Sequence, residues 1–148
     1  MAFIDRISAK VIKVPLASST KDGVIRELIE LLVAAGKVTD FAKSYEAVLA
    51  REALASTGLE NGIAVPHAKT LAVGDLSVAI GVAPSGVDFA ALDGRPSYLF
   101  FLLLAPPDKS GPHIEALAEI ARLTRSPAFT RALRASTTPD EVMDLFKE

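Results

Sequence analysis

The sequence predicts an α/β fold, in which a sheet is covered on both faces by helices. Segments with helical spacing of apolar residues alternate along the chain with short β-prone runs. One such run, Ser97 to Leu104, is apolar throughout its middle, which is typical of a strand buried on both faces. Half of the 148 residues are apolar, and no linker or repeat divides them. We therefore expect one well-packed domain over residues 1–148.

The first part of the chain is expected to form one strand and two helices. The strand covers Val11 to Val14, and Ser18-Ser19-Thr20 supplies caps for the helix that follows. That helix ends near Gly36, because glycine readily adopts the left-handed conformation found after helix C-termini. A second helix begins near Asp40, and its last turn carries Arg51.

A short β-prone run, Ile63 to Val65, is followed directly by Pro66 and His67. Gly58 and Gly62 precede it in turn-prone company, so the run is expected to be a short strand that stops at the imidazole. Proline fixes its own φ and pushes the preceding residue into the extended region. The backbone that presents His67 should therefore be held in place.

Two longer strands are expected further on, over Leu76 to Val82 and Ser97 to Leu104. Pro84-Ser85-Gly86 and Asp93-Gly94 have turn-forming composition around the short segment Val87 to Leu92. The second strand, apolar through its middle, should lie at the centre of the sheet.

Three helices are expected in the last part of the chain. The loop Pro106 to Pro112 leads to His113, which we place at the start of a helix. A further helix is expected over Pro127 to Ala135, and Thr138 to Glu141 forms a capping box for a last helix that runs to about Phe146. The face of the first of these helices that should pack on the sheet consists of Ile114, Leu117, Ala118 and Ala121.

Charge and composition exclude several classes of function. The 16 basic and 18 acidic residues are interspersed and give a net charge of -2, so we expect no nucleic-acid partner. No apolar run approaches the roughly 18 to 20 residues that span a bilayer, so we expect no insertion into a membrane and a cytoplasmic location. The absence of cysteine excludes disulfides, thiolate zinc sites and a cysteine nucleophile.

The sequence lacks the motifs of two other chemistries, metal-dependent catalysis and serine hydrolysis. Two histidines with nearby carboxylates could ligate zinc, but the helical spacing H-E-x-x-H of many catalytic zinc sites is absent. The G-x-S-x-G elbow of a serine hydrolase is also absent. We therefore expect neither a metal nor a cofactor.

Three neighbouring motifs carry a resemblance to a known family. Arg51-Glu52, Ser56-Thr57-Gly58 and Gly62 to His67 resemble the active-site signature of enzyme IIA domains of the fructose/mannitol class. These domains belong to the bacterial phosphoenolpyruvate-dependent sugar phosphotransferase system, and the class includes nitrogen-regulatory IIA proteins. The resemblance covers nearly the whole chain. It implies a mixed sheet of about five strands.

The resemblance also implies a phosphotransferase component that carries phosphohistidine. His67 would accept a phosphoryl group from the phosphocarrier HPr, or from its nitrogen-pathway paralogue, and pass it to a IIB partner. Imidazole suits this role, because it is a good nucleophile at neutral pH and its phosphoramidate can donate onward. A serine ester would retain the phosphate, so Ser56 and Thr57 are candidates for contacts with phosphate oxygens only. The alternative is that His67 is an ordinary surface or packing histidine.

Three further residues are candidates for the same site. The resemblance implies that His113 orients or stabilises the phosphoryl group, and the positive end of a helix dipole should keep it neutral and donating. The guanidinium of Arg51 can hold phosphoryl oxygens bidentately. Lys69 could contact phosphate or face solvent. The alternatives are a simple helix-start residue for His113 and a solvated helix-end charge for Arg51.

Two functions share this site and remain open at this point. One is a phosphoryl carrier in sugar uptake of the fructose/mannitol type. The other is a nitrogen-regulatory IIA protein whose phosphorylation state controls partner binding. The Ala68-Lys69 pair after the histidine is more similar to the sugar-type pattern, and Glu60 places a negative charge where many relatives have a neutral residue.

Overall fold

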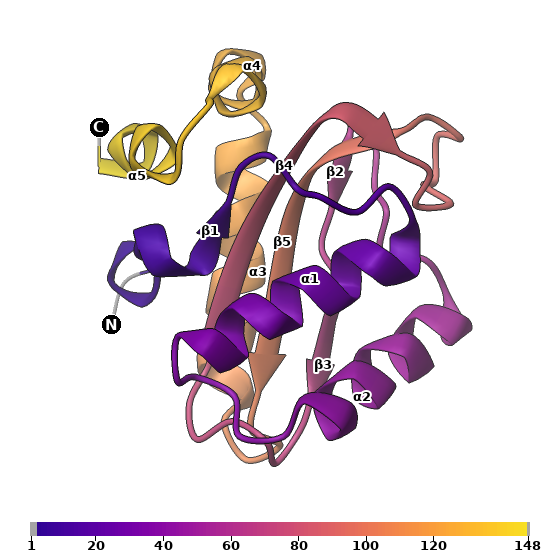
Figure 1. Cartoon of the computed structure of the whole chain (residues 1–148), viewed down its shortest axis with the longest axis vertical. Helices are drawn as coiled ribbons and strands as arrows, with labels where there is room; N and C mark the ends of the chain where they lie inside the picture. The colour runs from indigo at the N-terminus through magenta and orange to yellow at the C-terminus, as the bar shows by residue number, and fades with distance from the viewer. Residues whose placement is uncertain (1–2, 148) are drawn as a thin grey trace.

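The computed structural model describes residues 3–147, which fold into five α-helices around a five-stranded mixed sheet. Helices α1 and α2 cover one face of the sheet and α3 lies behind the other (Figure 1). No helix in this range has the length and apolar character needed to cross a membrane. The strands are β1 (Ile12–Lys13), β2 (Ile63–Ala64), β3 (His67–Lys69), β4 (Ser77–Val87) and β5 (Ser97–Ala105). The helices are α1 (Lys21–Ala34), α2 (Phe41–Leu54), α3 (Ser110–Thr124), α4 (Pro127–Ala135) and α5 (Pro139–Lys147), with short 3-10 helices at Phe3–Arg6 and Ala9–Val11. The expected α/β fold with a mixed sheet is confirmed.

Strand β5 is the centre of the sheet. It pairs antiparallel with β4 along one edge, and both β2 and β3 pair parallel with its other edge. Strand β1 extends the sheet by pairing parallel with β4. Every residue from Leu99 to Ala105 is at most 1% exposed, as expected for a strand covered on both faces. The prediction that this run is buried and central is confirmed.

The sequence predicted a short strand that stops at His67, but the structure differs. Strand β2 covers Ile63–Ala64, and a second strand, β3, begins at His67 itself. The ladder is interrupted because Pro66 has no N–H to donate, although its carbonyl accepts a hydrogen bond of 3.0 Å from the amide of Leu103. The imidazole is therefore anchored from both sides by pairing with β5.

Strand β4 is longer than predicted, because Pro84-Ser85-Gly86 lies inside it and not in a turn. The pairing with β5 shifts register between Val82 and Val87, and Gly86 has a φ of 80°. Such irregularities absorb residues with turn-forming geometry into a strand. The second predicted turn, Asp93-Gly94, is present, with the Gly94 amide 3.0 Å from the carbonyl of Ala91.

Capping chemistry fixes the starts of the two N-terminal helices as predicted. The hydroxyl of Thr20 accepts from the amide of Gly23 at 3.1 Å, and the Asp40 carboxylate accepts from Lys43 at 3.0 Å. Gly36 follows α1 with a φ of 76°, the left-handed conformation that ends many helices.

The predicted packing face of α3 is wrong. The buried residues are His113, Ala116 and Ile120, whereas Ile114 is 65% exposed. Apolar side chains occupy two adjoining faces of this helix, so their spacing does not decide which face meets the sheet. The consequence for the site is direct, because the buried face carries His113 inward.

Candidate active site

Two histidines from distant parts of the chain meet at one end of the sheet. His67 opens β3, which pairs with the C-terminal end of β5, and the loop after β5 leads straight into α3 with His113 in its first turn. The two ring centroids lie 5.4 Å apart, with an angle of 74° between the ring planes. The topology thus brings the two predicted histidines edge to face.

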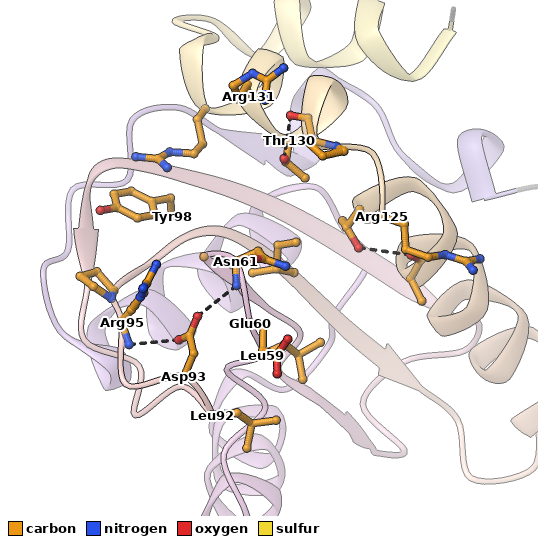
Figure 2. Close-up of a pocket in the computed structure, with 17 residues that line it drawn as sticks. Leu59, Glu60, Asn61, Leu92, Asp93, Arg95, Tyr98, Arg125, Thr130 and Arg131 are labelled. Atoms are coloured by element: carbon orange, nitrogen blue, oxygen red, sulfur yellow. Dashed lines mark hydrogen bonds between the residues drawn. The ribbon is translucent and has the colours of Figure 1, made fainter.

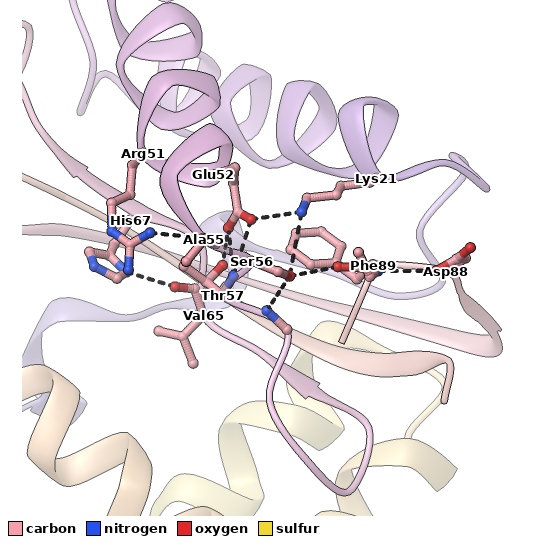
Figure 3. Close-up of polar contacts among 12 residues, drawn as sticks. Lys21, Arg51, Glu52, Ala55, Ser56, Thr57, Val65, His67, Asp88 and Phe89 are labelled. Atoms are coloured by element: carbon pink, nitrogen blue, oxygen red, sulfur yellow. Dashed lines mark hydrogen bonds and ion pairs between the residues drawn. The ribbon is translucent and has the colours of Figure 1, made fainter. Parts of the chain in front are cut away.

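The ring of His67 is oriented by its own strand connection. Its Nδ1 lies 2.8 Å from the carbonyl oxygen of Val65 (Figure 3). A carbonyl oxygen only accepts, so Nδ1 carries the proton of the neutral ring and Nε2 holds the lone pair. The half-buried His67 therefore presents Nε2 as a nucleophile.

His113 is held in the neutral state. Burial lowers its pKa below the ordinary value of 6.5, and the positive charge that His67 carries when protonated, together with that of Lys69, lowers the pKa further. The side chain is 6% exposed, and its buried Nε2 has no hydrogen-bond partner among the described residues. Burial, more than the helix dipole named in the sequence analysis, is the main cause of the lowered pKa. The ring offers an unused polar atom beside His67.

Arg51 and His67 line the same pocket, which has a volume of about 270 Å³. Arg51 lies in the last turn of α2, where its Nη1 donates to the carbonyl of Ala55 at 2.9 Å (Figure 3). This bond steadies the side chain and uses one of the five N–H donors of a guanidinium. The site therefore combines a nucleophile with a fixed positive charge.

Ser56 and Thr57 also line this pocket, and their hydroxyls are engaged with the protein. The Ser56 hydroxyl donates to the carbonyl of Phe89 at 2.8 Å and accepts from the amide of Gly58 at 3.0 Å. The Thr57 hydroxyl donates to Glu52. Either hydroxyl could contact a phosphate only by giving up its hydrogen bond to Phe89 or to Glu52. In this structure the two residues therefore stabilise the wall of the pocket.

Glu52 and Lys21 support the site and were not predicted to do so. Glu52 is 8% exposed, accepts from the amide of Thr57 at 3.1 and 3.2 Å, and pairs with Lys21 Nζ at 2.8 Å (Figure 3). The spacing of Ser44, Val48 and Glu52, four residues apart on α2, was a signal that this carboxylate faces inward. No local pattern identifies Lys21, at the start of α1, as its partner.

Lys69 connects the two elements that carry the histidines. Its side chain is exposed, and its Nζ donates to the hydroxyl of Ser110 at 3.1 Å, at the first residue of α3. Its charge contributes to the lowered pKa of His113. Lys69 therefore adds positive potential at the rim of the site.

The group of residues around His67 fits the chemistry of an anion transfer. The imidazole of His67 and the guanidinium of Arg51 line one small pocket, and the neutral imidazole of His113 lies beside the His67 ring; such groups can bind and stabilise a phosphoryl group. No cluster of three or more His, Asp or Glu side chains suited to a metal ion occurs within residues 3–147.

Comparison with known proteins defines the family. Residues 6–148 match the family model described as "Phosphoenolpyruvate-dependent sugar phosphotransferase system, EIIA 2". The chain belongs to this family.

Two relatives in sequence are both named fructose-specific. The chain is 34% identical to the "PTS system fructose-specific EIIABC component" of Bacillus subtilis over 148 residues, which cover 100% of this chain and 23% of that protein. It is 35% identical to the "PTS system fructose-specific EIIA component" of Haloferax volcanii over 130 residues, which cover 88% of this chain and 84% of that one. The chain thus spans less than a quarter of the first relative and most of the second.

Two solved structures resemble the fold closely. Nitrogen regulatory protein IIA-Ntr from Neisseria meningitidis superposes with a TM-score of 0.88 at 28% identity, covering 96% of this chain and 97% of that chain. Enzyme IIAMtl of Escherichia coli, solved as a complex with phosphorylated enzyme IIBMtl, gives a TM-score of 0.81 at 27% identity and covers 95% and 96% of the two chains.

Proposed function

We propose that this chain is a phosphoryl-carrier IIA component that accepts phosphate from phospho-HPr on His67 and passes it to a IIB protein in sugar uptake. The observation that carries the proposal is the hydrogen bond from His67 Nδ1 to the Val65 carbonyl, because it leaves Nε2 as the free nucleophile. The pocket beside this nitrogen contains Arg51, and His113 lies edge to face with the His67 ring.

The transfer step follows from this geometry. The Nε2 lone pair attacks phosphorus, the new N–P bond forms as the bond to the donor's atom breaks, and the donor keeps that electron pair. Positive charge develops on the imidazole, and the Val65 carbonyl stabilises it at Nδ1–H. Arg51 compensates charge on the phosphoryl oxygens, and His113 donates a hydrogen bond to one of them. Transfer to IIB runs the same step in reverse onto the acceptor's nucleophile.

The assignment to sugar uptake is supported by the two fructose-specific relatives and by the IIA–IIB complex of similar fold. The Ala68-Lys69 pair after the histidine points the same way. A second candidate is a nitrogen-regulatory role, favoured by the high similarity to IIA-Ntr. In that role the phosphorylation state of His67 would control partner binding, with a nitrogen-pathway paralogue of HPr as the donor.

Phosphotransfer from labelled phospho-HPr tests the proposal. Wild-type protein should take up acid-labile, alkali-stable label, and His67→Ala should take up none. His113→Ala and Arg51→Ala should still be labelled but about a hundred to a thousandfold more slowly, because each loses a pre-placed donor and keeps the nucleophile.

Two controls complete this experiment. Arg122→Ala removes an exposed arginine that is paired with Glu119, away from the pocket, and should leave the rate unchanged. Faster labelling by HPr than by its nitrogen-pathway paralogue supports the sugar role, and the opposite order supports the regulatory one. Undiminished labelling of folded His67→Ala would reject the mechanism.

A further inference from the structure

A second, larger pocket adjoins the active-site pocket, with a volume of about 840 Å³ (Figure 2). It lies between the loop that leads into β2, the loop that leads into β5, the C-terminal end of α3, and one face of α4. Leu59, Ala121 and Thr124 line both pockets, so the two are contiguous. The residues that do the chemistry at His67 do not line the larger pocket.

Four arginines line this second pocket: Arg95, Arg125, Arg131 and Arg134. Glu60 and Asp93 are the only carboxylates among the described residues of the lining, which therefore carry a formal charge of +2, in a chain whose net charge is -2. The pocket is therefore positively charged although the protein as a whole is negatively charged, as in sites that attract anions.

None of the four arginines of the pocket forms an ion pair with a carboxylate among residues 3–147. The ion pairs found within the described residues are Arg6 with Asp75, Lys21 with Glu52, and Arg122 with Glu119, all outside this pocket.

The carboxylate of Asp93 is committed to its own loop. It accepts from the backbone amides of Arg95 at 3.0 Å and Asn61 at 3.2 Å (Figure 2). The amide of Arg95 is the main cause that lowers the pKa of Asp93. The four guanidinium groups therefore keep their capacity to bind an anion.

One of the four guanidinium groups is held in place by an aromatic ring. The Arg134 guanidinium lies 3.5 Å from the ring centroid of Tyr98, a close cation–π contact that orients its donors. Tyr98 belongs to β5, and its ring also packs closely against Gly62 and Gly86. This wall of the pocket is therefore anchored in the central strand.

We propose that this pocket binds a phosphorylated small molecule that carries at least two phosphoryl groups. Its volume falls in the range of small-molecule sites, roughly 300 to 1,000 Å³. Guanidinium groups hold phosphate oxygens in paired, charge-assisted hydrogen bonds. Arg95 lies on the opposite side of the pocket from Arg125 and Arg131 (Figure 2), so the guanidinium groups are spread in a way that fits an anion with more than one phosphoryl group. The proposal does not depend on phosphotransfer at His67.

Isothermal titration of the unphosphorylated protein with inorganic pyrophosphate tests the site. Saturable binding of one pyrophosphate per chain is expected in about 0.15 M salt. Arg95→Gln/Arg131→Gln should weaken binding at least tenfold, because it removes two of the four guanidinium groups and their charge-assisted hydrogen bonds to the anion. Arg122→Gln, an exposed arginine of α3 outside the pocket, should bind as the wild type does. ATP and a sugar bisphosphate in parallel titrations identify the class of ligand by which of them binds more tightly.

The same titration separates this site from the active site. His67→Ala should bind pyrophosphate with unchanged affinity, even though it takes up no label from phospho-HPr. Loss of binding in His67→Ala would place the anion at the active site and overturn the proposal. The proposal is equally overturned by the absence of saturable binding of all three compounds, or by equal weakening in Arg122→Gln and in Arg95→Gln/Arg131→Gln. Thermal unfolding of each variant confirms that it is folded.

Discussion

The side chains of Lys21 and Glu52 form a buried ion pair. In a double-mutant cycle on the free energy of unfolding, this pair should show a larger interaction energy than an exposed ion pair does. The side chains of Lys21 and Glu52 are 23% and 4% exposed, and their charged atoms lie 2.8 Å apart. Glu52 also accepts hydrogen bonds from the amide and the hydroxyl of Thr57. Removal of one partner therefore leaves a charge in surroundings from which water is largely excluded.

The magnitudes follow from this burial. Breaking a fully buried pair costs about 3 to 5 kcal/mol. Lys21 retains some access to water, so we expect Lys21→Met and Glu52→Gln each to lower the free energy of unfolding by about 2 kcal/mol. The double variant leaves no unpaired charge, and a glutamine carbonyl can still accept from the Thr57 amide. Its cost should fall short of the sum of the two single costs by about 1 to 2 kcal/mol.

Urea unfolding followed by circular dichroism measures this coupling. The matched control is the pair Arg122 and Glu119, which is in hydrogen-bond contact at 2.6 Å but has side chains 61% and 34% exposed. The cycle of Arg122→Met and Glu119→Gln should give a coupling below about 0.5 kcal/mol, because solvent screens exposed pairs. A coupling for Lys21 and Glu52 no larger than that of the control would refute the reasoning.

Two further predictions concern the surroundings of the site. Wild-type protein should lose stability as pH falls through about 6.5, because burial and the charge of His67 lower the pKa of His113 in the folded state, so that the unfolded chain binds a proton first. His113→Asn lacks this group and should lose less stability between pH 7.5 and 5.5. Equal slopes of the urea midpoint against pH in the two proteins would contradict this. Gly58→Ala should cost about 1 to 3 kcal/mol, since its Cβ would lie 2.9 Å from the backbone of Ala91; an unchanged midpoint in the same urea assay would show that this backbone moves freely.

Features set by local chemistry were predictable from the sequence. Thr20, Asp40 and Gly36 start or end helices through contacts with residues within a few positions of themselves. The central position of β5 could also be predicted, because a strand without polar residues is buried on both faces only where helices cover both sides of the sheet. Arg51 in the last turn of α2 and His113 in the first turn of α3 follow from the same kind of pattern.

Features that depend on packing between distant segments were not predictable. The partner of Glu52 lies on another helix, 31 positions away at Lys21. The orientation of α3 depends on which of two apolar faces meets the sheet, and the exposure of Ile114 shows the outcome. The path of β4 through Gly86 depends on a register shift against β5, which no composition reveals.

A chain of contacts links this unpredicted ion pair to the imidazole of His67. Lys21 pairs with Glu52, and Glu52 holds the amide and hydroxyl of Thr57. The carbonyl of Thr57 accepts from the amide of Val65 at 3.0 Å, and the carbonyl of Val65 accepts from Nδ1 of His67 at 2.8 Å. The bond that leaves Nε2 free as a nucleophile is therefore the last of a series that begins on α1. The buried carboxylate one position after Arg51 is thus connected, through Thr57 and Val65, to the ring of His67.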